Sequence, residues 1–180
     1  MRKILITGAS GAGTTTLGRA LAGHLALPCF DADDFFWHPT SPPYKRLVKP
    51  EARLAAILDQ LGRHPEWVLS GSVVNWGAAL EDLFTLIVWR TVPTDLRIAR
   101  LIQRSLARFG EPPRPELLAW AARYDAGGLD VRSRALHEKW LSARTCAIVR
   151  IDGDLTVAAC LARTLAALRA PRPNGGPQET

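Results

Sequence analysis

Short apolar runs alternate along the chain with longer stretches in which apolar residues recur every three or four positions. The apolar runs predict strands over residues 3–7, 28–30, 67–69, 83–92 and 147–151. The periodic stretches predict helices over about residues 14–25, 50–61, 94–109, 115–124, 131–143 and 156–168. Strands that alternate with helices form a parallel sheet covered on both faces, so we expect a three-layer α/β fold with five strands. In such sheets, ligands bind outside the carboxyl ends of the strands.

Length and composition agree with one globular domain. The chain has 180 residues, of which 47% are hydrophobic and 22% are charged. Residues 170–180 have the composition of a disordered tail, so we expect the domain to cover residues 1–169. No apolar run approaches the ~20 residues that a membrane span requires, and no signal peptide is visible. Cys29, Cys146 and Cys160 lack a metal-ligand spacing and are predicted to be buried thiols in a reducing cytoplasm.

A glycine-rich stretch joins the first predicted strand to the first predicted helix. It consists of Gly8, Ala9, Ser10, Gly11, Ala12, Gly13, Thr14, Thr15 and Thr16. In this context backbone N–H groups curl around an anion, and the helix N-terminus adds partial positive charge. The spacing fits the phosphate-loop pattern G-x-x-x-x-G-K-S/T at every fixed position except one, because Thr14 stands where the lysine belongs. A glycine turn without a ligand is the alternative; we predict a nucleotide site, with the Thr15 hydroxyl as a Mg²⁺ ligand.

Two carboxylates follow the second predicted strand. Asp31 and Asp33 are two residues apart, so in an extended chain their side chains point to the same side. This strand end opens on the same edge of the sheet as the glycine-rich stretch. A carboxylate there can accept a proton from a hydroxyl group or hold water on Mg²⁺. An acidic turn without a function is the alternative.

The stretch Gly8–Thr16, followed by Phe30-Asp31-Ala32-Asp33, resembles the P-loop kinases of small molecules and nucleotides, the adenylate kinase and shikimate kinase group. The resemblance is specific over residues 1–37 and diffuse over 60–165. It implies a P-loop NTPase fold with a helical lid over about residues 105–140, and it implies binding of ATP or another nucleoside triphosphate with Mg²⁺. In that group the first aspartate of Asp-x-Asp lies near the metal, which Asp31 matches. The second lies on the hydroxyl of the substrate, which Asp33 matches.

Arginines recur at helical spacing further along the chain. Arg97, Arg100, Arg104 and Arg108 would form one stripe on a helix. This segment is similar to the adenylate kinase stretch that enters the lid, where an R-x-x-x-R pair contacts phosphates; Arg100 and Arg104 match that pair. A solvated basic face is the alternative.

Two turns after strands resemble further parts of these kinases. Ser70-Gly71-Ser72 stands where the kinases cradle their substrate, and Asp152-Gly153-Asp154 resembles the loop whose backbone lies against adenine. Ordinary turns would explain both segments. The four histidines, at positions 24, 38, 64 and 137, show no pairing with Cys or Ser and are predicted to be surface or core residues.

Two departures from the kinase pattern bear on catalysis. Thr14 replaces the lysine, and Ser70 stands where nucleotide kinases usually carry an aspartate. An arginine of the lid, Arg100 or Arg104, could supply the missing cation, since an arginine finger contributes ~10³ or more in rate.

The sequence therefore predicts phosphoryl transfer to a small molecule or nucleotide acceptor, with Asp33, Arg100 and Arg104 as the catalytic residues. A nucleotide-binding or regulatory module without turnover is the alternative. The net charge of +6 also raises nucleic acid as a partner, but no lysine-rich tract or aromatic RNA-binding motif accompanies it.

Overall fold

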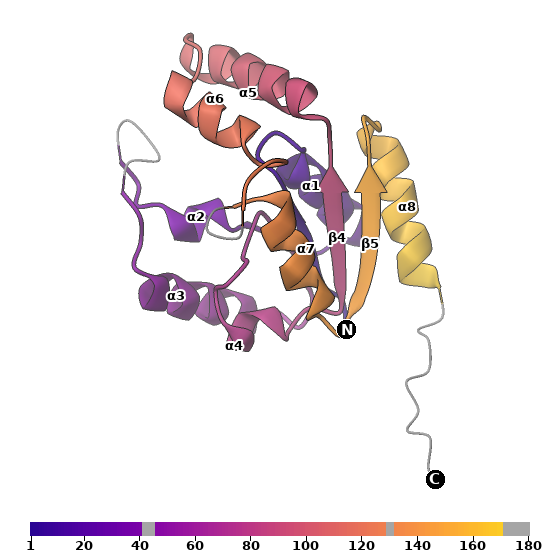
Figure 1. Cartoon of the computed structure of the whole chain (residues 1–180). Coiled ribbons are helices and arrows are strands. Elements are labelled where there is room, and N and C mark those ends of the chain that lie inside the picture. Colours follow the sequence, from indigo (N-terminus) through magenta and orange to yellow (C-terminus); the bar gives the residue numbers. More distant parts are fainter. Residues whose placement is uncertain (41–45, 129–131, 171–180) are drawn as a thin grey trace.

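The computed structural model describes residues 1–40, 46–128 and 132–170 and contains one parallel sheet (Figure 1). The strands are β1 (Lys3–Gly8), β2 (Cys29–Asp31), β3 (Trp67–Ser70), β4 (Leu86–Thr91) and β5 (Ala147–Asp152). Their order in the sheet is β2-β3-β1-β4-β5, which places β1 and its following loop at the centre. This confirms the predicted five-stranded α/β fold. The predicted tail falls almost wholly on residues 171–180, which lie outside the described residues.

Helices cover both faces of the sheet. They are α1 (Thr14–Leu25), α2 (Asp33–Phe36), α3 (Pro50–Gly62), α4 (Ala78–Glu81), α5 (Thr94–Phe109), α6 (Pro115–Ala122), α7 (Arg134–Ser142) and α8 (Val157–Arg169). The short helices α2 and α4 were not predicted, and β4 begins later than predicted because α4 and a turn precede it. Helices α5 and α6 lie beyond the carboxyl ends of the strands (Figure 1).

The alternation of side chains along the strands produces two hydrophobic cores. Ile4 and Ile6 of β1 pack with residues of α1 and α8, such as Leu21 and Cys160. Leu5, between them, belongs to the opposite core with residues of α3, α4 and α7. Ile4, Leu5 and Ile6 are all fully buried, as expected for a central parallel strand with helices on both faces of the sheet.

Most of helix α7 lies within the residue range predicted as a lid, yet the helix packs against the sheet. Its His137, Trp140 and Leu141 are buried, and the Trp140 Nε1 donates a hydrogen bond of 2.7 Å to Oε2 of Glu81 in α4. Helix α7 is therefore part of the core. The end of α5 and α6 project beyond the strands, and their movement as a lid stays a prediction.

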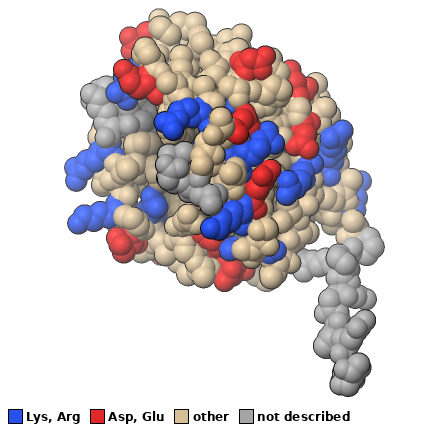
Figure 2. All heavy atoms as spheres, viewed as in Figure 1, with Lys and Arg blue, Asp and Glu red and all other residues tan. Residues whose placement is uncertain are grey.

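The surface and the cysteines bear on the remaining expectations. On the face shown in Figure 2, Lys and Arg side chains are interspersed with Asp and Glu. Within the described residues, none of the helices combines the length and the apolar character that crossing a membrane requires. Cys160 is buried as predicted, whereas Cys29 is exposed because it lies on the edge strand β2 and Cys146 is half-buried; all three thiols are free.

Candidate functional site

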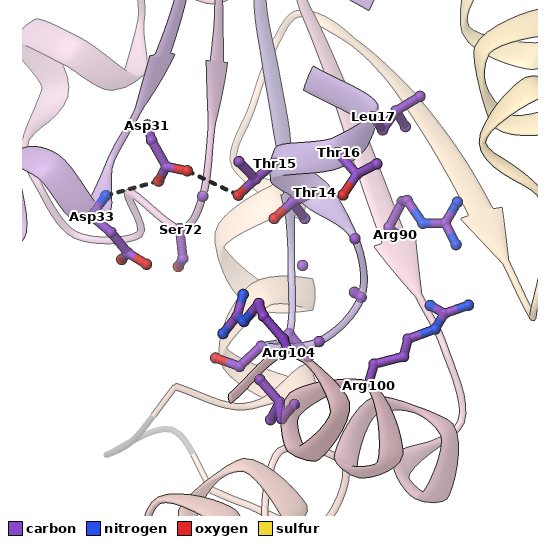
Figure 3. Close-up of a pocket in the computed structure, with 18 of the residues that line it drawn as sticks. Thr14, Thr15, Thr16, Leu17, Asp31, Asp33, Ser72, Arg90, Arg100 and Arg104 are labelled. Atoms are coloured by element: carbon purple, nitrogen blue, oxygen red, sulfur yellow. Dashed lines mark hydrogen bonds between the residues drawn. The ribbon is translucent and has the colours of Figure 1, made fainter. Parts of the chain in front are cut away.

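A cavity of about 410 Å³ opens at the carboxyl ends of the strands, and every predicted site residue lines it (Figure 3). These are residues 8–16, Asp31, Asp33, Arg100 and Arg104. Gly71 and Ser72, from the turn that resembles the substrate cradle of the kinases, also line it. Six further lining residues belong to none of the predicted catalytic, metal or phosphate-binding sets: Leu17, Arg90, Leu101, Arg132, Leu155 and Val157. Residues far apart in the sequence therefore meet in one space.

The glycine-rich loop between β1 and α1 has a backbone that side chains would disrupt. Gly11 has φ +83°, and a Cβ atom there would lie 2.5 Å from the carbonyl oxygen of Arg97. Gly13, the N-cap of α1, is also left-handed, with φ +84°. No side chain caps this helix, so the amide groups of its first turn have no partner within the helix. Uncapped amides at a helix N-terminus form a favourable environment for an anion.

Arg97 is a structural residue, which corrects the prediction of a four-arginine stripe. Its side chain is fully buried, so it belongs neither to a solvated basic face nor to the lining of the cavity. Its guanidinium donates to the carbonyl oxygens of Ser10 in the loop, at 3.3 Å, and Ala121 in α6, at 3.0 Å. It also pairs with the Asp125 carboxylate at 3.0 Å. Arg97 thus joins the loop, α5 and α6.

A hydroxyl and a carboxylate meet beside the loop. Oγ1 of Thr15 donates to Oδ2 of Asp31 at 2.9 Å (Figure 3). The described part of the chain contains no group of three or more His, Cys, Asp or Glu residues that could hold a metal. Two oxygen ligands from the protein, completed by phosphate oxygens and water, are the arrangement in which Mg²⁺ is usually bound. The residues present therefore fit Mg²⁺ together with a polyphosphate.

The prediction that Asp31 and Asp33 project from one side of an extended chain is wrong. Ala32 has helical dihedral angles and Asp33 is the first residue of α2, so the chain turns between the two carboxylates. The turn is closed by the N–H of Asp33, which donates to Oδ1 of Asp31 at 3.1 Å. Both residues still line the cavity.

The Asp33 carboxylate opens into the cavity but is surrounded by protein atoms and charged side chains. Burial raises its pKa, and the nearby Arg132 counteracts that rise. Asp31 and Asp34 raise the pKa further, whereas Arg104 lowers it. A carboxylate with a raised pKa and two adjacent cations is suited to accept a proton near an anionic ligand.

The arginines that line the cavity differ in their interaction partners. Arg100 forms an ion pair with Asp154, after β5, and points away from Asp33 (Figure 3). Arg104 is exposed and makes no ion pair with any residue within the described ranges. Arg132 lies 5.7 Å from the centroid of the Trp120 ring. Arg104 and Arg132 therefore provide the positive charge near Asp33. Arg132 is one of the arginines that flank the pair Gly127-Gly128, and it belongs to no recognisable motif, so its role could not be assigned from sequence.

His137 corrects the expectation that no histidine pairs with a serine. Its Nε2 lies 3.3 Å from both the Thr7 and the Ser72 hydroxyl oxygens, and its Nδ1 lies 3.0 Å from the Ser133 carbonyl oxygen. Because a carbonyl accepts, Nδ1 carries the proton and Nε2 accepts from a hydroxyl. Burial lowers the pKa of His137 to about 4, so the ring is neutral at pH 7. The Thr7 and Ser72 hydroxyls are both within reach of this one acceptor, and Ser72 lines the cavity.

Arg90 is a further residue that the motifs did not identify. It occupies the end of β4, its side chain is 3% exposed, and it contacts the Sγ of Cys160. Its Nε has no hydrogen-bond partner in the structure. An arginine at the end of an otherwise apolar buried strand is the sequence signal that could have revealed it.

Comparison with known proteins identifies a related protein. No family model matches the sequence. The uncharacterized protein YqaC of Bacillus subtilis (strain 168) is 36% identical over 165 residues, which are 87% of this chain and 91% of that protein.

Two solved structures share the architecture. A gluconokinase from Sinorhizobium meliloti 1021 superposes with a TM-score of 0.54 at 17% identity, covering 93% of this chain and 91% of that one. A shikimate kinase from Acinetobacter baumannii, in complex with shikimate, superposes with a TM-score of 0.56 at 19% identity, covering 93% and 92%. The chain therefore has the fold of the P-loop kinases.

Proposed function

The chain belongs to the same family as YqaC of Bacillus subtilis, and we propose that it is a P-loop phosphotransferase. We infer that it binds a nucleoside triphosphate with Mg²⁺ and transfers the terminal phosphoryl group to a small molecule or nucleotide acceptor. One observation carries the proposal. A glycine-rich loop, an oxygen pair suited to Mg²⁺, a carboxylate and several arginines all line one cavity of about 410 Å³. We also propose a cytoplasmic location, because nucleoside triphosphates and Mg²⁺ are present there.

Residues 8–16 hold the phosphates in this proposal, through backbone amides and the N-terminus of α1. Thr15 and Asp31 hold Mg²⁺, which neutralises phosphate charge when it is bound. Thr14 takes the place of the usual lysine, so the loop itself contributes no side-chain cation.

Asp33 is the proposed proton acceptor. The hydroxyl oxygen of the acceptor forms a bond to the terminal phosphorus while the bond from that phosphorus to its bridging oxygen breaks. The hydroxyl proton passes to Asp33. Ser72, whose hydroxyl lies 3.3 Å from Nε2 of His137, orients the acceptor. An acceptor that receives the phosphoryl group on its own phosphate would attack through an oxygen of that phosphate instead, and no hydroxyl proton would be transferred.

Arg104 is the residue that we propose replaces the missing lysine, with Arg132 beside it. Both act on Asp33 electrostatically, and both line the cavity. Arg100 is assigned to the nucleoside side of the site because its charge is paired with Asp154. This assignment separates two arginines that resemblance alone treats alike.

A coupled assay over a panel of hydroxyl and phosphate acceptors, combined with calorimetry of nucleotide binding, tests the proposal. Arg104→Ala should lower turnover by about 10³ or more while nucleotide affinity stays within a few-fold. Arg100→Ala should instead weaken nucleotide binding. Arg108→Ala is the matched control, because Arg108 lies on the same helix, is exposed and does not line the cavity. Ordinary turnover in Arg104→Ala would reject the assignment.

A double-mutant cycle tests whether Arg104 does the work of the lysine. Thr14→Lys restores a cation to the loop, so it should make the Arg104→Ala substitution less harmful than it is in the wild-type background. Equal losses of turnover in both backgrounds would contradict the replacement.

The absence of the lysine favours one other candidate, a nucleotide-binding module without turnover. That candidate predicts nucleotide binding with no transfer to any acceptor of the panel. Failure of millimolar adenine and guanine nucleotides to bind with Mg²⁺ would remove both candidates.

A further inference from the structure

Arg90 is a buried cation that lacks an adequate partner. It forms no ion pair with a carboxylate in the described part of the chain, and its Nε has no hydrogen-bond partner. The contact of its guanidinium with the Cys160 thiol is with a weak acceptor. Burying a charged donor without acceptors is unfavourable, so the residues that the structure describes leave this group incompletely satisfied. Because Arg90 lines the cavity, a bound ligand can supply the missing acceptors.

The position of Arg90 indicates which part of a ligand it meets. In Figure 3, Arg90 and Arg100 lie on one side of the glycine-rich loop, whereas Asp33 and Ser72 lie on the other. Leu155, which precedes α8, and Val157, its first residue, line the same cavity, so the cavity extends past the loop toward α8.

The proposed function then fixes the orientation of the nucleotide. The terminal phosphate must face Asp33, and the nucleoside must therefore lie on the side of Arg90. Leu101, Leu155 and Val157 provide the apolar surface that a base requires there.

We propose that Arg90 reads the base and selects one that presents two adjacent acceptors, as guanine does with O6 and N7. This inference rests on the proposed function. A guanidinium group has hydrogen-bond donors and no acceptor, and two of its N–H groups can bond to O6 and N7 of guanine at the same time. Adenine presents N7 beside an amino donor, which would face a donor of Arg90. The site should therefore prefer guanine nucleotides to adenine nucleotides.

Calorimetry on the wild-type chain with Mg²⁺ tests the proposal without any substitution. GTP and ITP, which share O6 and N7, should bind about tenfold or more tightly than ATP. 7-Deaza-GTP, which lacks the N7 acceptor, should lose most of that advantage. Equal affinities for GTP and ATP, or a preference for ATP, would overturn the inference.

Two variants locate the preference at Arg90. Arg90→Lys keeps the charge but loses the two-pronged geometry, and Arg90→Met removes the charge; both should reduce the GTP-to-ATP ratio toward one. Arg108→Ala should leave the ratio unchanged. Circular dichroism and thermal unfolding establish that each variant is folded, and a folded variant that retains the full preference refutes the assignment.

The outcomes for the two proposals differ. If ATP and GTP bind equally and phosphate is transferred, the base assignment falls and the phosphotransferase stands. If guanine nucleotides are preferred but nothing is transferred, the base assignment stands alone. If no nucleotide binds, both fall.

Discussion

His137 predicts a loss of stability in mild acid that can be calculated from its environment. Its pKa falls from 6.5 to about 4 because it is buried, so the folded state resists protonation. The unfolded state binds the proton more readily below pH 6.5, and stability must therefore decrease as pH falls through the window from 6.5 to about 4. The difference in pKa corresponds to about 3 kcal/mol of unfolding free energy over the whole window, and about 2 kcal/mol between pH 7.5 and 5.

Urea unfolding at pH 7.5 and at pH 5 measures this loss, and substitutions isolate the share of His137. His137→Gln keeps an acceptor for the Thr7 and Ser72 hydroxyls but cannot be protonated. It should be less stable than wild type at pH 7.5 and should lose about 2 kcal/mol less on acidification. His24→Gln, at an exposed position on α1, is the control and should keep the wild-type pH dependence.

The protonation state of His137 can also be followed directly by NMR. The imidazole resonances of His137 in the wild-type protein should remain those of a neutral ring, protonated on Nδ1, from pH 7 down to pH 5. If His137 titrates near 6.5, or if His137→Gln loses as much stability as wild type between pH 7.5 and 5, the assigned environment is wrong.

Three further substitutions follow from the site. Asp33→Asn removes a carboxylate whose pKa is raised by burial, so thermal stability at pH 7 should increase. This gain should vanish in acid below the ordinary pKa of aspartate, and turnover should fall by about 10² or more. A lowered melting temperature at pH 7 would contradict this. Arg97→Met should cost about 3 kcal/mol in urea unfolding, because buried carbonyl acceptors and the Asp125 carboxylate lose their donor; a cost near zero would refute the structural role. Gly11→Ala should destabilise the chain and weaken nucleotide binding, since its Cβ would lie 2.5 Å from the Arg97 carbonyl oxygen. Gly23→Ala, which meets nothing within 4 Å, should be neutral or stabilising, and equal effects of the two substitutions would contradict the clash.

Sequence patterns predicted the sheet because its strands are apolar on both faces and separated by regular helices. The glycine-rich loop was equally visible, since its residue types are those that its backbone needs. The short helices α2 and α4 were not predicted, because a helix of a single turn is too short to show a hydrophobic period. Their existence depends on contacts formed by the whole fold.

The roles of single side chains were harder to predict than the elements that carry them. Spacing placed Arg97 and Arg104 on one face of a helix, but burial separates a structural arginine from one that opens into the cavity. His137 and Ser72 are 65 residues apart in the sequence, and no local pattern joins them. Tertiary packing brings such pairs together, so a motif search cannot find them.

The support that Arg97 gives to the glycine-rich loop has a kinetic consequence. The Ser10 carbonyl oxygen accepts from this guanidinium, and the Gly11 backbone lies against the Arg97 carbonyl group, so the loop is braced from outside the cavity. A ligand then meets a receptor already in its binding shape, and little conformational entropy is lost on association. The first phase of nucleotide association should accordingly be rapid, with a rate that rises linearly with concentration and no slow rearrangement of the loop.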